Sequence, residues 1–599
     1  MDLRPETPIG NLLRNDFWGT PVHTEKSHKS FRPLAVLTFR LNFLLGDLNP
    51  FGYHLGNVAV HGLVCYFTTH LLSVVMPSLG ATAVASLLFA VHPIHTESVA
   101  SVVGRAEVLS ALCYCLAFLC YVQAMRARRL CSAEHAVCLV LCLALALAGM
   151  LCKEGGITVL GVCFAVEVFV LLRLLRLAPP PRRPPLSQPP AKEAGAAEAG
   201  GGASAGAAGA AGAAGAAGAA STIEHSTHPA SIRVAGVTTD CEPDTTLARS
   251  LCRLTLLVAC LGFALYCRTV TTGTSFGPTF SNVDNNLFYG ATPWIRAMSY
   301  AYLHFCYAWQ LAFPIHLSCD WSYNGVAVVE NINDPRNIHT MICYAIVAAI
   351  GFGALARRNG RVLMSLALTI LPFIPSSNVL FPIATVLAER LLYLPSIGFC
   401  ALLALLFEAL GGGGGDGEEE DASGGLAKIE GPGHSDGENA NDETDDADAG
   451  DAGDAGDAGD MSAAAAATKE GNTEADADKE GTEHARSNTG RTQHDASAPR
   501  PTLLGTPRMT TRMRCSRAAA AVLFALFAAK TVHRNAEWRT PLALFTSAAK
   551  VVPTSCKAHI CVAAALHEVG DVKGALLAIN RSLAIKHDFA GAYFLLGNL

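Results

Sequence analysis

The 599-residue sequence contains little charge, and its first residues do not form a secretion signal. Only 16% of residues are Asp, Glu, Lys or Arg, 51% are hydrophobic, and the mean hydropathy is positive. Residues 1–30 are polar and lack the apolar core of a signal peptide. This composition excludes an ordinary soluble globular protein and predicts a polytopic membrane protein.

The 20 cysteines contain no C-x-x-C pair, and most of them lie inside apolar runs. Zinc sites and disulfide frameworks need cysteines at short, regular spacings. We therefore interpret these cysteines as small hydrophobic side chains. The formal net charge of −6 is uninformative as a whole, because acidic residues collect in one insert and arginines in short loops.

Ten apolar runs are long enough to be candidates for membrane spans. Cytosolic loops are enriched in Lys and Arg, and four arginine clusters fall on one side if the ten runs alternate. We assign that side to the cytosol, which requires residues 297–316 to be re-entrant or to lie on the surface. The runs are 52–76, 79–99, 105–125, 135–152, 156–176, 249–267, 341–357, 361–376, 393–410 and 515–531. The clusters are Arg126, Arg128 and Arg129; Arg173, Arg176, Arg182 and Arg183; Arg357, Arg358 and Arg361; and Arg512, Arg514 and Arg517.

Composition divides the chain into seven parts. A Pro/Ala/Gly-rich insert and an acidic insert lack apolar periodicity, so both are predicted to be disordered cytosolic loops. The parts are a partial first luminal loop (1–50), transmembrane helices (51–177), the first insert (178–248), transmembrane helices with luminal loops (249–410), the acidic insert (411–512), a last transmembrane helix (513–532) and helical repeats (533–599).

The last part shows a repeat of 34 residues. Ala558 opens one helical pattern and Ala592 opens a similar one 34 residues later, the period of tetratricopeptide repeats. An unrelated helical hairpin is the alternative. The chain stops inside its second full repeat, whereas a stable stack needs about three repeats, so we expect a truncated product.

The stretch from Phe89 to Val108, which joins the second and third apolar runs, carries His92, His95, Glu97, Arg105 and Glu107. Ionisable groups at the end of a membrane hairpin are costly unless they face a partner or a cavity, which makes this stretch a candidate functional site. The alternative is an interfacial turn, in which His92-Pro93 ends one helix and Gly104 opens the next.

On the predicted topology, further polar residues share this face of the membrane. A carboxylate that deprotonates an acceptor hydroxyl, beside cations that stabilise a departing phosphate, suits group transfer from a lipid phosphate. Lys153 and Glu154 have an alternative role as snorkelling residues at a span end. We predict no metal, because a His pair interrupted by proline is a weak ligand pattern. The predicted catalytic residues are Asp16, Glu97 and Glu107; the phosphate-binding residues are Arg32, Arg105, Lys153 and Arg390; and the supporting polar residues are His92, His95, Glu154 and Glu389.

Several motifs together resemble the transmembrane and tetratricopeptide repeat protein family. They are N-D-F-W-G at 15–19, H-K-S-F-R-P-L at 28–34, N-P-F-G-Y-H-L at 49–55, H-P-I-H-T-E-S at 92–98, V-G-R-A-E at 103–107, C-K-E at 152–154 and A-E-R-L-L-Y-L-P-S at 388–396, all ahead of the repeats.

The resemblance implies an all-α membrane helical bundle like the C-type glycosyltransferases, followed by a luminal tetratricopeptide α-solenoid. It implies an endoplasmic-reticulum protein O-mannosyltransferase with dolichyl-phosphate mannose as donor and no other cofactor. The expected acceptors are Ser and Thr of secretory-pathway proteins, notably cadherins, and nucleic acid is not an expected partner.

The sequence departs from the family pattern at its start. Family members begin with a signal-anchor span and an acidic pair in the first luminal loop, whereas this sequence opens with Met1-Asp2-Leu3-Arg4-Pro5 and leaves Asp16 to match. We therefore expect an N-terminal truncation, which puts catalysis by this chain in doubt, whereas the complete protein is expected to be a transferase. The rival function is a non-enzymatic membrane adaptor that binds partners through its repeats. A transporter is disfavoured, because paired inverted halves are not found.

Overall fold

The computed structural model describes residues 3–127, 132–172, 233–234, 237–238, 243–273, 280–289, 292–412 and 509–599. Most of the predicted inserts 178–248 and 411–512 lies outside these residues. The regular secondary structure of the described chain is helical apart from the two-residue strands β1 (Arg233–Val234) and β2 (Val237–Thr238), which pair in antiparallel fashion. The predicted all-α fold is confirmed.

Within the described residues, seven helical segments are long and apolar enough to cross a membrane. They contain α2 (Pro50–Val75), α5 (Arg105–Arg126), α6 (Ala133–Cys152), α7 (Val159–Leu171), α8 (Pro243–Thr272), α10 (Arg336–Ala356) and α13 (Thr511–Glu537). Four shorter apolar helices are α1 (Pro33–Gly46), α3 (Leu79–Ala90), α11 (Gly360–Phe373) and α12 (Pro395–Leu410). The other helical elements are η1 (Ile9–Leu13), α4 (His95–Ala100), η2 (Val102–Gly104), η3 (Glu154–Thr158), α9 (Pro293–Ala312), η4 (Tyr323–Gly325), η5 (Ile374–Ser376), η6 (Glu389–Leu392), α14 (Pro541–Val551), α15 (Cys556–Glu568), α16 (Val572–Ile585) and α17 (Ala590–Asn598).

The predicted run 79–99 is two helices and not one. α3 ends at Ala90, and the buried helix α4 starts again at His95. Pro93 lacks a backbone N–H and disfavours a helical conformation at His92, so the chain turns here. The turn places His92 and the polar residues of α4 inside the protein.

Helix α9 overlaps the run 297–316, which the orientation required not to span. It is not among the seven span candidates. The Arg296 guanidinium lies 5.2 Å from the centre of the Phe288 ring near its start, and the Leu311 carbonyl near its end lies 3.1 Å from Nε2 of His92. The non-spanning role of this run stays a prediction.

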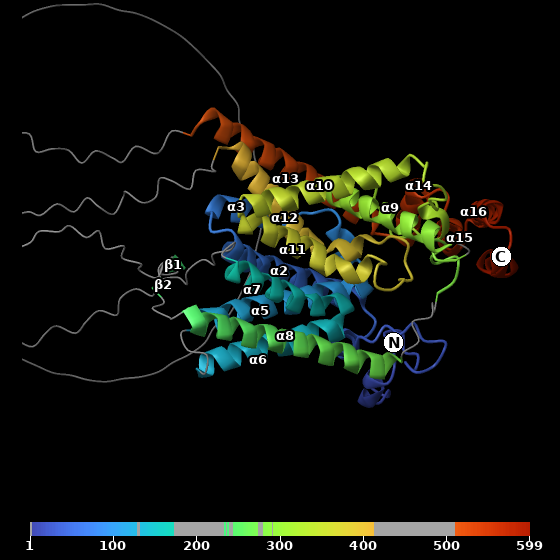
Figure 1. Cartoon of the computed structure of the whole chain (residues 1–599). Helices are drawn as coiled ribbons and strands as arrows, with labels where there is room; N and C mark the ends of the chain where they lie inside the picture. The colour runs from blue at the N-terminus through green and yellow to red at the C-terminus, as the bar shows by residue number, and fades with distance from the viewer. Residues whose placement is uncertain are drawn as a thin grey trace, which may run out of the picture. The chain divides into compact units, whose positions relative to one another are not determined.

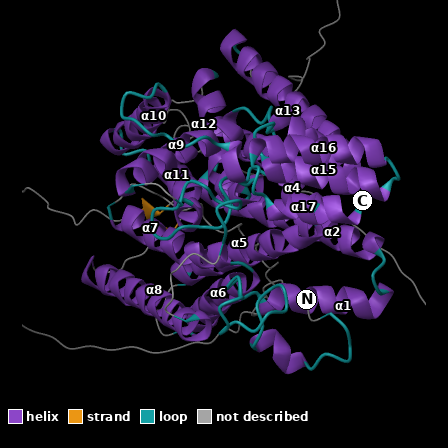
Figure 2. Ribbon diagram, turned by 90° about the vertical axis from the view of Figure 1, so that its right-hand side faces the viewer, coloured by secondary structure: helices purple, strands orange, loops and turns teal. Residues whose placement is uncertain are grey.

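The main hydrophobic core lies among α2, α3, α5, α6, α7 and α12 and includes the buried Tyr114, Phe118 and Tyr121 of α5. In Figure 1, α14, α15 and α16 and both marked chain termini lie at one end of this helical bundle. Figure 2 views that end and shows α15, α16 and α17 on the side that carries α13 and α4, away from α8 and α6. The C-terminal helices therefore cover one end of the bundle.

Helices α11 and α12 approach closely at Gly398, where a Cβ atom would lie 2.5 Å from the backbone nitrogen of Thr369. Gly398→Ala is therefore expected to lower the free energy of unfolding by about 1–3 kcal/mol, because the added methyl group has no space. Thermal unfolding in detergent micelles measures this loss. Gly353→Ala on α10 is the control, since its Cβ would meet nothing within 4 Å. Equal unfolding temperatures for the two variants would contradict the prediction.

Candidate functional site

Four of the predicted site residues form a continuous chain of alternating charge. The backbone N–H of Arg390 donates to Oε2 of Glu97 at 2.9 Å, and its guanidinium pairs with Oε1 of Glu97. Nε of Arg390 also lies 3.6 Å from Oε1 of Glu107. The Lys153 ammonium pairs with the same Glu107 oxygen. The fold thus brings α4, η6, α5 and the turn before η3 to one place.

A second group of ions adjoins the first, because Glu154 follows Lys153 in the chain. Oε2 of Glu154 lies 3.0 Å from Arg32, and Oε1 lies 3.2 Å from Arg268 at the end of α8. One carboxylate therefore holds two arginines. We call these seven residues the ionic cluster: Arg32, Glu97, Glu107, Lys153, Glu154, Arg268 and Arg390.

The exposed side of the ionic cluster is cationic. The side chains of Arg390, Arg268 and Arg32 are 33%, 28% and 21% exposed, whereas those of Glu97 and Glu107 are 2% and 6% exposed. Among the carboxylates of the cluster, Glu154 is the exposed one, at 23%, and it lies between Arg32 and Arg268. The cluster also holds four cations against three carboxylates. Guanidinium groups offer several N–H donors in a plane and bind phosphate well. The arrangement can therefore accept an anion at the end of the bundle.

Glu389 lies beside the ionic cluster but is fully buried. Its Oε1 accepts the backbone N–H of Ser318, and its Oε2 lies 3.8 Å from Arg534 near the end of α13. Arg534 also pairs with Glu537. Burial raises the pKa of Glu389 to about 8, and the Arg534 guanidinium opposes that rise. Glu389 thus connects the site to the last membrane helix.

His92 and His95 lie in a buried aromatic group. His92 Nε2 lies 3.1 Å from the Leu311 carbonyl, and His95 Nε2 lies 2.9 Å from Oγ of Ser396. Burial lowers the pKa of His92 to about 3, so its imidazole is neutral at physiological pH. Among the described residues, groups of three or more His, Cys, Asp or Glu that could hold a metal ion are absent.

Arg105 occupies a separate place in the structure. Its Nε donates to Oδ1 of Asn57 at 2.8 Å, and its terminal nitrogens donate to the carbonyls of Tyr53 and Thr38 and to Asn42. The guanidinium therefore joins α1 and α2 to α5. The role predicted for Arg105, binding of the donor phosphate, stays a prediction.

Asp16 organises its own loop. Its carboxylate accepts hydrogen bonds from the backbone N–H groups of Trp18, Thr20 and His28 and from Oγ of Ser27, at 2.8–3.0 Å. The next residue, Phe17, places its ring 5.4 Å from Cζ of Arg32. The loop thus abuts the ionic cluster, and a catalytic role for Asp16 stays a prediction.

Sequence reasoning missed Arg268 and Arg534, which belong to or adjoin the site. Both stand near the end of a predicted span, on the side that the arginine clusters leave poor in basic residues. A cation on that side departs from the usual enrichment of Lys and Arg in the cytosol. That departure is the signal that could have identified them.

The opposite end of the bundle carries the two arginine clusters that lie wholly within the described residues, at the start of α11 and at the start of α13. Arg361 at the start of α11 lies 3.4 Å from Glu408 near the end of α12, and Ser516 near the start of α13 donates to the Phe407 carbonyl. The other ends of α12 and α13 carry Arg390 and Arg534. For these two clusters, site residues and basic loops lie at opposite ends, as the charge pattern predicts.

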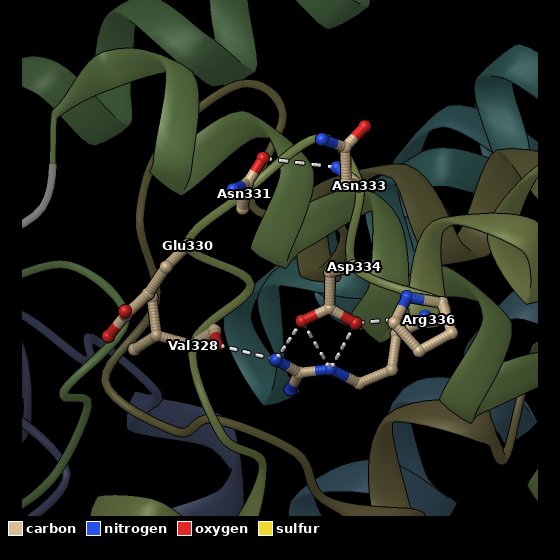
Figure 3. Close-up of a pocket in the computed structure, with 7 residues that line it drawn as sticks. Val328, Glu330, Asn331, Asn333, Asp334 and Arg336 are labelled. Carbon is tan, nitrogen blue, oxygen red and sulfur yellow. Dashed lines mark hydrogen bonds and ion pairs between the residues drawn. The ribbon is translucent and has the colours of Figure 1, made fainter.

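Figure 3 shows a surface hollow of about 350 Å³ that is separate from the ionic cluster. The Arg336 guanidinium holds the Asp334 carboxylate and donates to the Val328 carbonyl at 2.7 Å (Figure 3). The backbone N–H of Asn333 donates to Oδ1 of Asn331. The predicted site residues do not line this hollow.

Comparisons with known proteins show which proteins this chain resembles. Residues 275–348 match the family model "Protein O-mannosyl-transferase TMTC, DUF1736". The chain is 36% identical over 442 residues to protein O-mannosyl-transferase Tmtc3 of Drosophila melanogaster, covering 68% of this chain and 42% of that protein. It is 35% identical over 414 residues to TMTC3 of Homo sapiens, covering 67% of this chain and 38% of that protein. It is 33% identical over 429 residues to TMTC4 of Mus musculus, covering 68% of this chain and 51% of that protein.

The chain thus spans about two fifths to one half of the length of these relatives. No solved structure matches the chain.

Proposed function

This chain belongs to the TMTC family of protein O-mannosyl-transferases, and we propose that it transfers mannose from dolichyl-phosphate mannose to Ser and Thr hydroxyls. The acceptors are secretory-pathway proteins such as cadherins, and the reaction takes place at the luminal face of the endoplasmic reticulum membrane. The ionic cluster is the site of this reaction. Helices α14 to α17 are the start of a luminal tetratricopeptide stack that engages the acceptor.

The single observation that carries this proposal is the cationic exposed side of the ionic cluster at one end of an apolar bundle. A lipid donor has its tail in the bilayer and its phosphate at the membrane surface. Arg390, Arg32 and Lys153 lie where such a phosphate would meet the protein. The buried carboxylates of Glu97 and Glu107 hold Arg390 and Lys153, and the partly exposed Glu154 holds Arg32.

The proposed reaction is a single displacement. The acceptor oxygen forms a bond to C1 of mannose while the bond from C1 to the phosphate oxygen breaks, so the configuration at C1 inverts. The electron pair of the broken bond stays on the dolichyl phosphate, whose charge the cations stabilise. A carboxylate takes the proton of the acceptor hydroxyl.

Glu107 is the carboxylate whose contacts suit it best for taking this proton. Arg390 occupies both oxygens of Glu97, and the loop around Asp16 occupies both oxygens of that residue. For Glu107, the contacts among the described residues reach only Oε1. Its second oxygen is the one left to face an acceptor hydroxyl.

Replacing Arg390 with glutamine tests the proposal. The variant loses the charge that would bind the donor phosphate, so kcat/KM for the lipid donor is expected to fall at least about tenfold, as for loss of one charge-assisted hydrogen bond. The assay is transfer of labelled mannose to an acceptor peptide by the chain in liposomes, together with direct binding of the lipid donor.

Arg539→Gln is the matched control, because Arg539 is exposed just beyond the end of α13. Equal activity of the two variants would reject the phosphate role of Arg390. A chain that neither binds the donor nor transfers mannose, yet captures luminal proteins through its C-terminal helices, would be the adaptor and not a transferase.

A further inference from the structure

The C-terminal helices contact a segment that lies far from them in the sequence. Nζ of Lys557 in α15 lies 3.1 Å from Oδ1 of Asp284, and Oγ1 of Thr554 donates to the Asn324 carbonyl at 2.8 Å. Nζ of Lys586, just after α16, lies 5.8 Å from the centre of the Tyr323 ring. We call residues 280–289 and 292–334 the bridge segment.

The same contact includes close apolar packing. A Cβ atom on Gly325 would lie 3.0 Å from Cγ1 of Val552, which is 2% exposed. Ser555 and Cys556, at the start of α15, are fully buried. The bridge segment and the C-terminal helices therefore meet through buried surface as well as through polar contacts.

On its other side, the bridge segment contacts the residues around the ionic cluster. The Tyr307 hydroxyl accepts the backbone N–H of Ala388 at 3.2 Å, and the backbone N–H of Ser318 donates to Glu389. Asn285 donates to the Ile383 carbonyl at 2.8 Å.

These contacts surround a shared hydrophobic core. It includes Leu287, Leu317 and Val326 of the bridge segment together with Ile94 and Leu392, which flank the site residues of α4 and η6. Interiors of this kind are packed like crystals and transmit displacements. A movement of the bridge segment would therefore move Glu97 and Arg390.

The C-terminal helices are thus attached to the bundle at two points. One is the covalent link from α13, where Arg534 joins Glu389 to Glu537. The other is the bridge segment. A single helical link would allow the C-terminal helices to rotate relative to the bundle, and the second attachment point restricts this rotation. A ligand bound to α14 to α17 therefore stays at a fixed distance from the ionic cluster.

We propose that the bridge segment fixes the position of the C-terminal helices relative to the ionic cluster and thereby sets the apparent affinity for folded protein acceptors. The proposal depends on the proposed transferase function. An acceptor held by these helices presents its hydroxyl at a high effective concentration, which depends on the geometry of the link. Lys557 and Gly325 are positioning residues, and they do not touch the substrates' reacting atoms.

Lys557→Glu is the main test. It places a carboxylate beside Asp284 and near Asp320, whose charge also acts on Lys557. The KM for a folded protein acceptor is expected to rise about fivefold or more, a coupling of ordinary size between two sites. The kcat, and transfer to a short Ser-containing peptide, should stay within about twofold, because a peptide reaches the site without the C-terminal helices. Lys573→Glu, on an exposed position of α16, is the control.

A second test uses the packing at Gly325. Gly325→Ala should raise the same KM, because the new methyl group presses on Val552, and adding Val552→Ala should restore it. Hydrogen exchange of residues 317–326 and of α15 in the intact chain gives a readout besides activity, and it should speed up in Lys557→Glu and in Gly325→Ala.

An equal loss of transfer to peptide and protein would overturn the proposal, since it would show damage to the site itself. An unchanged protein-acceptor KM in both variants would also overturn it. If the wild-type chain transfers no mannose to either acceptor, the proposed function fails; unchanged exchange in Lys557→Glu then overturns the positioning role independently.

Discussion

Glu107→Gln is expected to lower kcat for mannose transfer by about 100-fold or more, the usual contribution of a general base. Glutamine keeps the shape of the side chain but cannot accept the proton of the acceptor hydroxyl. Binding of the lipid donor should weaken far less, because Lys153 and Arg390 remain in place. Single-turnover transfer with saturating donor measures the effect.

The control for this variant is Glu330→Gln, a change of one exposed carboxylate on the bridge segment. Glu97→Gln should behave differently, because Glu97 holds Arg390 through both oxygens. Its donor KM should rise together with the fall in kcat. If Glu107→Gln transfers mannose at the wild-type rate, Glu107 is not the general base. Asp16 and Glu97 are then the remaining candidates for that role.

Glu167→Leu is expected to lower the free energy of unfolding by about 3–5 kcal/mol, because it leaves a buried arginine unpaired. Glu167 in α7 is fully buried, and its Oε1 accepts Nε–H of Arg253 in α8 at 2.9 Å. The Tyr121 hydroxyl in α5 donates to its other oxygen at 3.3 Å. Unfolding in mixed micelles measures the loss.

The double variant Glu167→Leu with Arg253→Met separates charge from packing. It removes both ions and keeps apolar volume between α7 and α8, so most of the lost stability should return. A double variant as unstable as Glu167→Leu alone would show that the effect comes from packing. Mannose transfer at low temperature should persist in both variants, because this pair lies at the end of the helices opposite to the ionic cluster.

Seven of the ten predicted runs overlap a described helix that is long and apolar enough to span, because length and apolarity act locally; the runs 79–99, 361–376 and 393–410 contain shorter helices. The break between α3 and α4 could also be expected, since proline at position 93 acts on its immediate neighbours. The C-terminal end of α3 could not be predicted, because the apolar run continues to Val99 in the sequence. Tertiary burial of α4, and not its own composition, decides where the polar residues turn inward.

The site was predictable as a set of residue types and not as a set of contacts. Glu97 and Arg390 are separated by 293 positions, and nothing in one sequence pairs them. Arg105 resembles Arg390 in the sequence, since both stand at the start of an apolar helix. The difference arises from their surroundings: carbonyls and amide oxygens of α1 and α2 surround Arg105, whereas Arg390 meets two carboxylates.

The described helix ends show where the two longest undescribed stretches attach. Residues 173–232 leave from the end of α7 and lead toward α8, and residues 413–508 connect the end of α12 to the start of α13. All four attachment points lie at the end of the bundle remote from the ionic cluster. A tag inserted in either connection is therefore expected to leave the ionic cluster undisturbed, because the insertion point lies at the far end of the bundle.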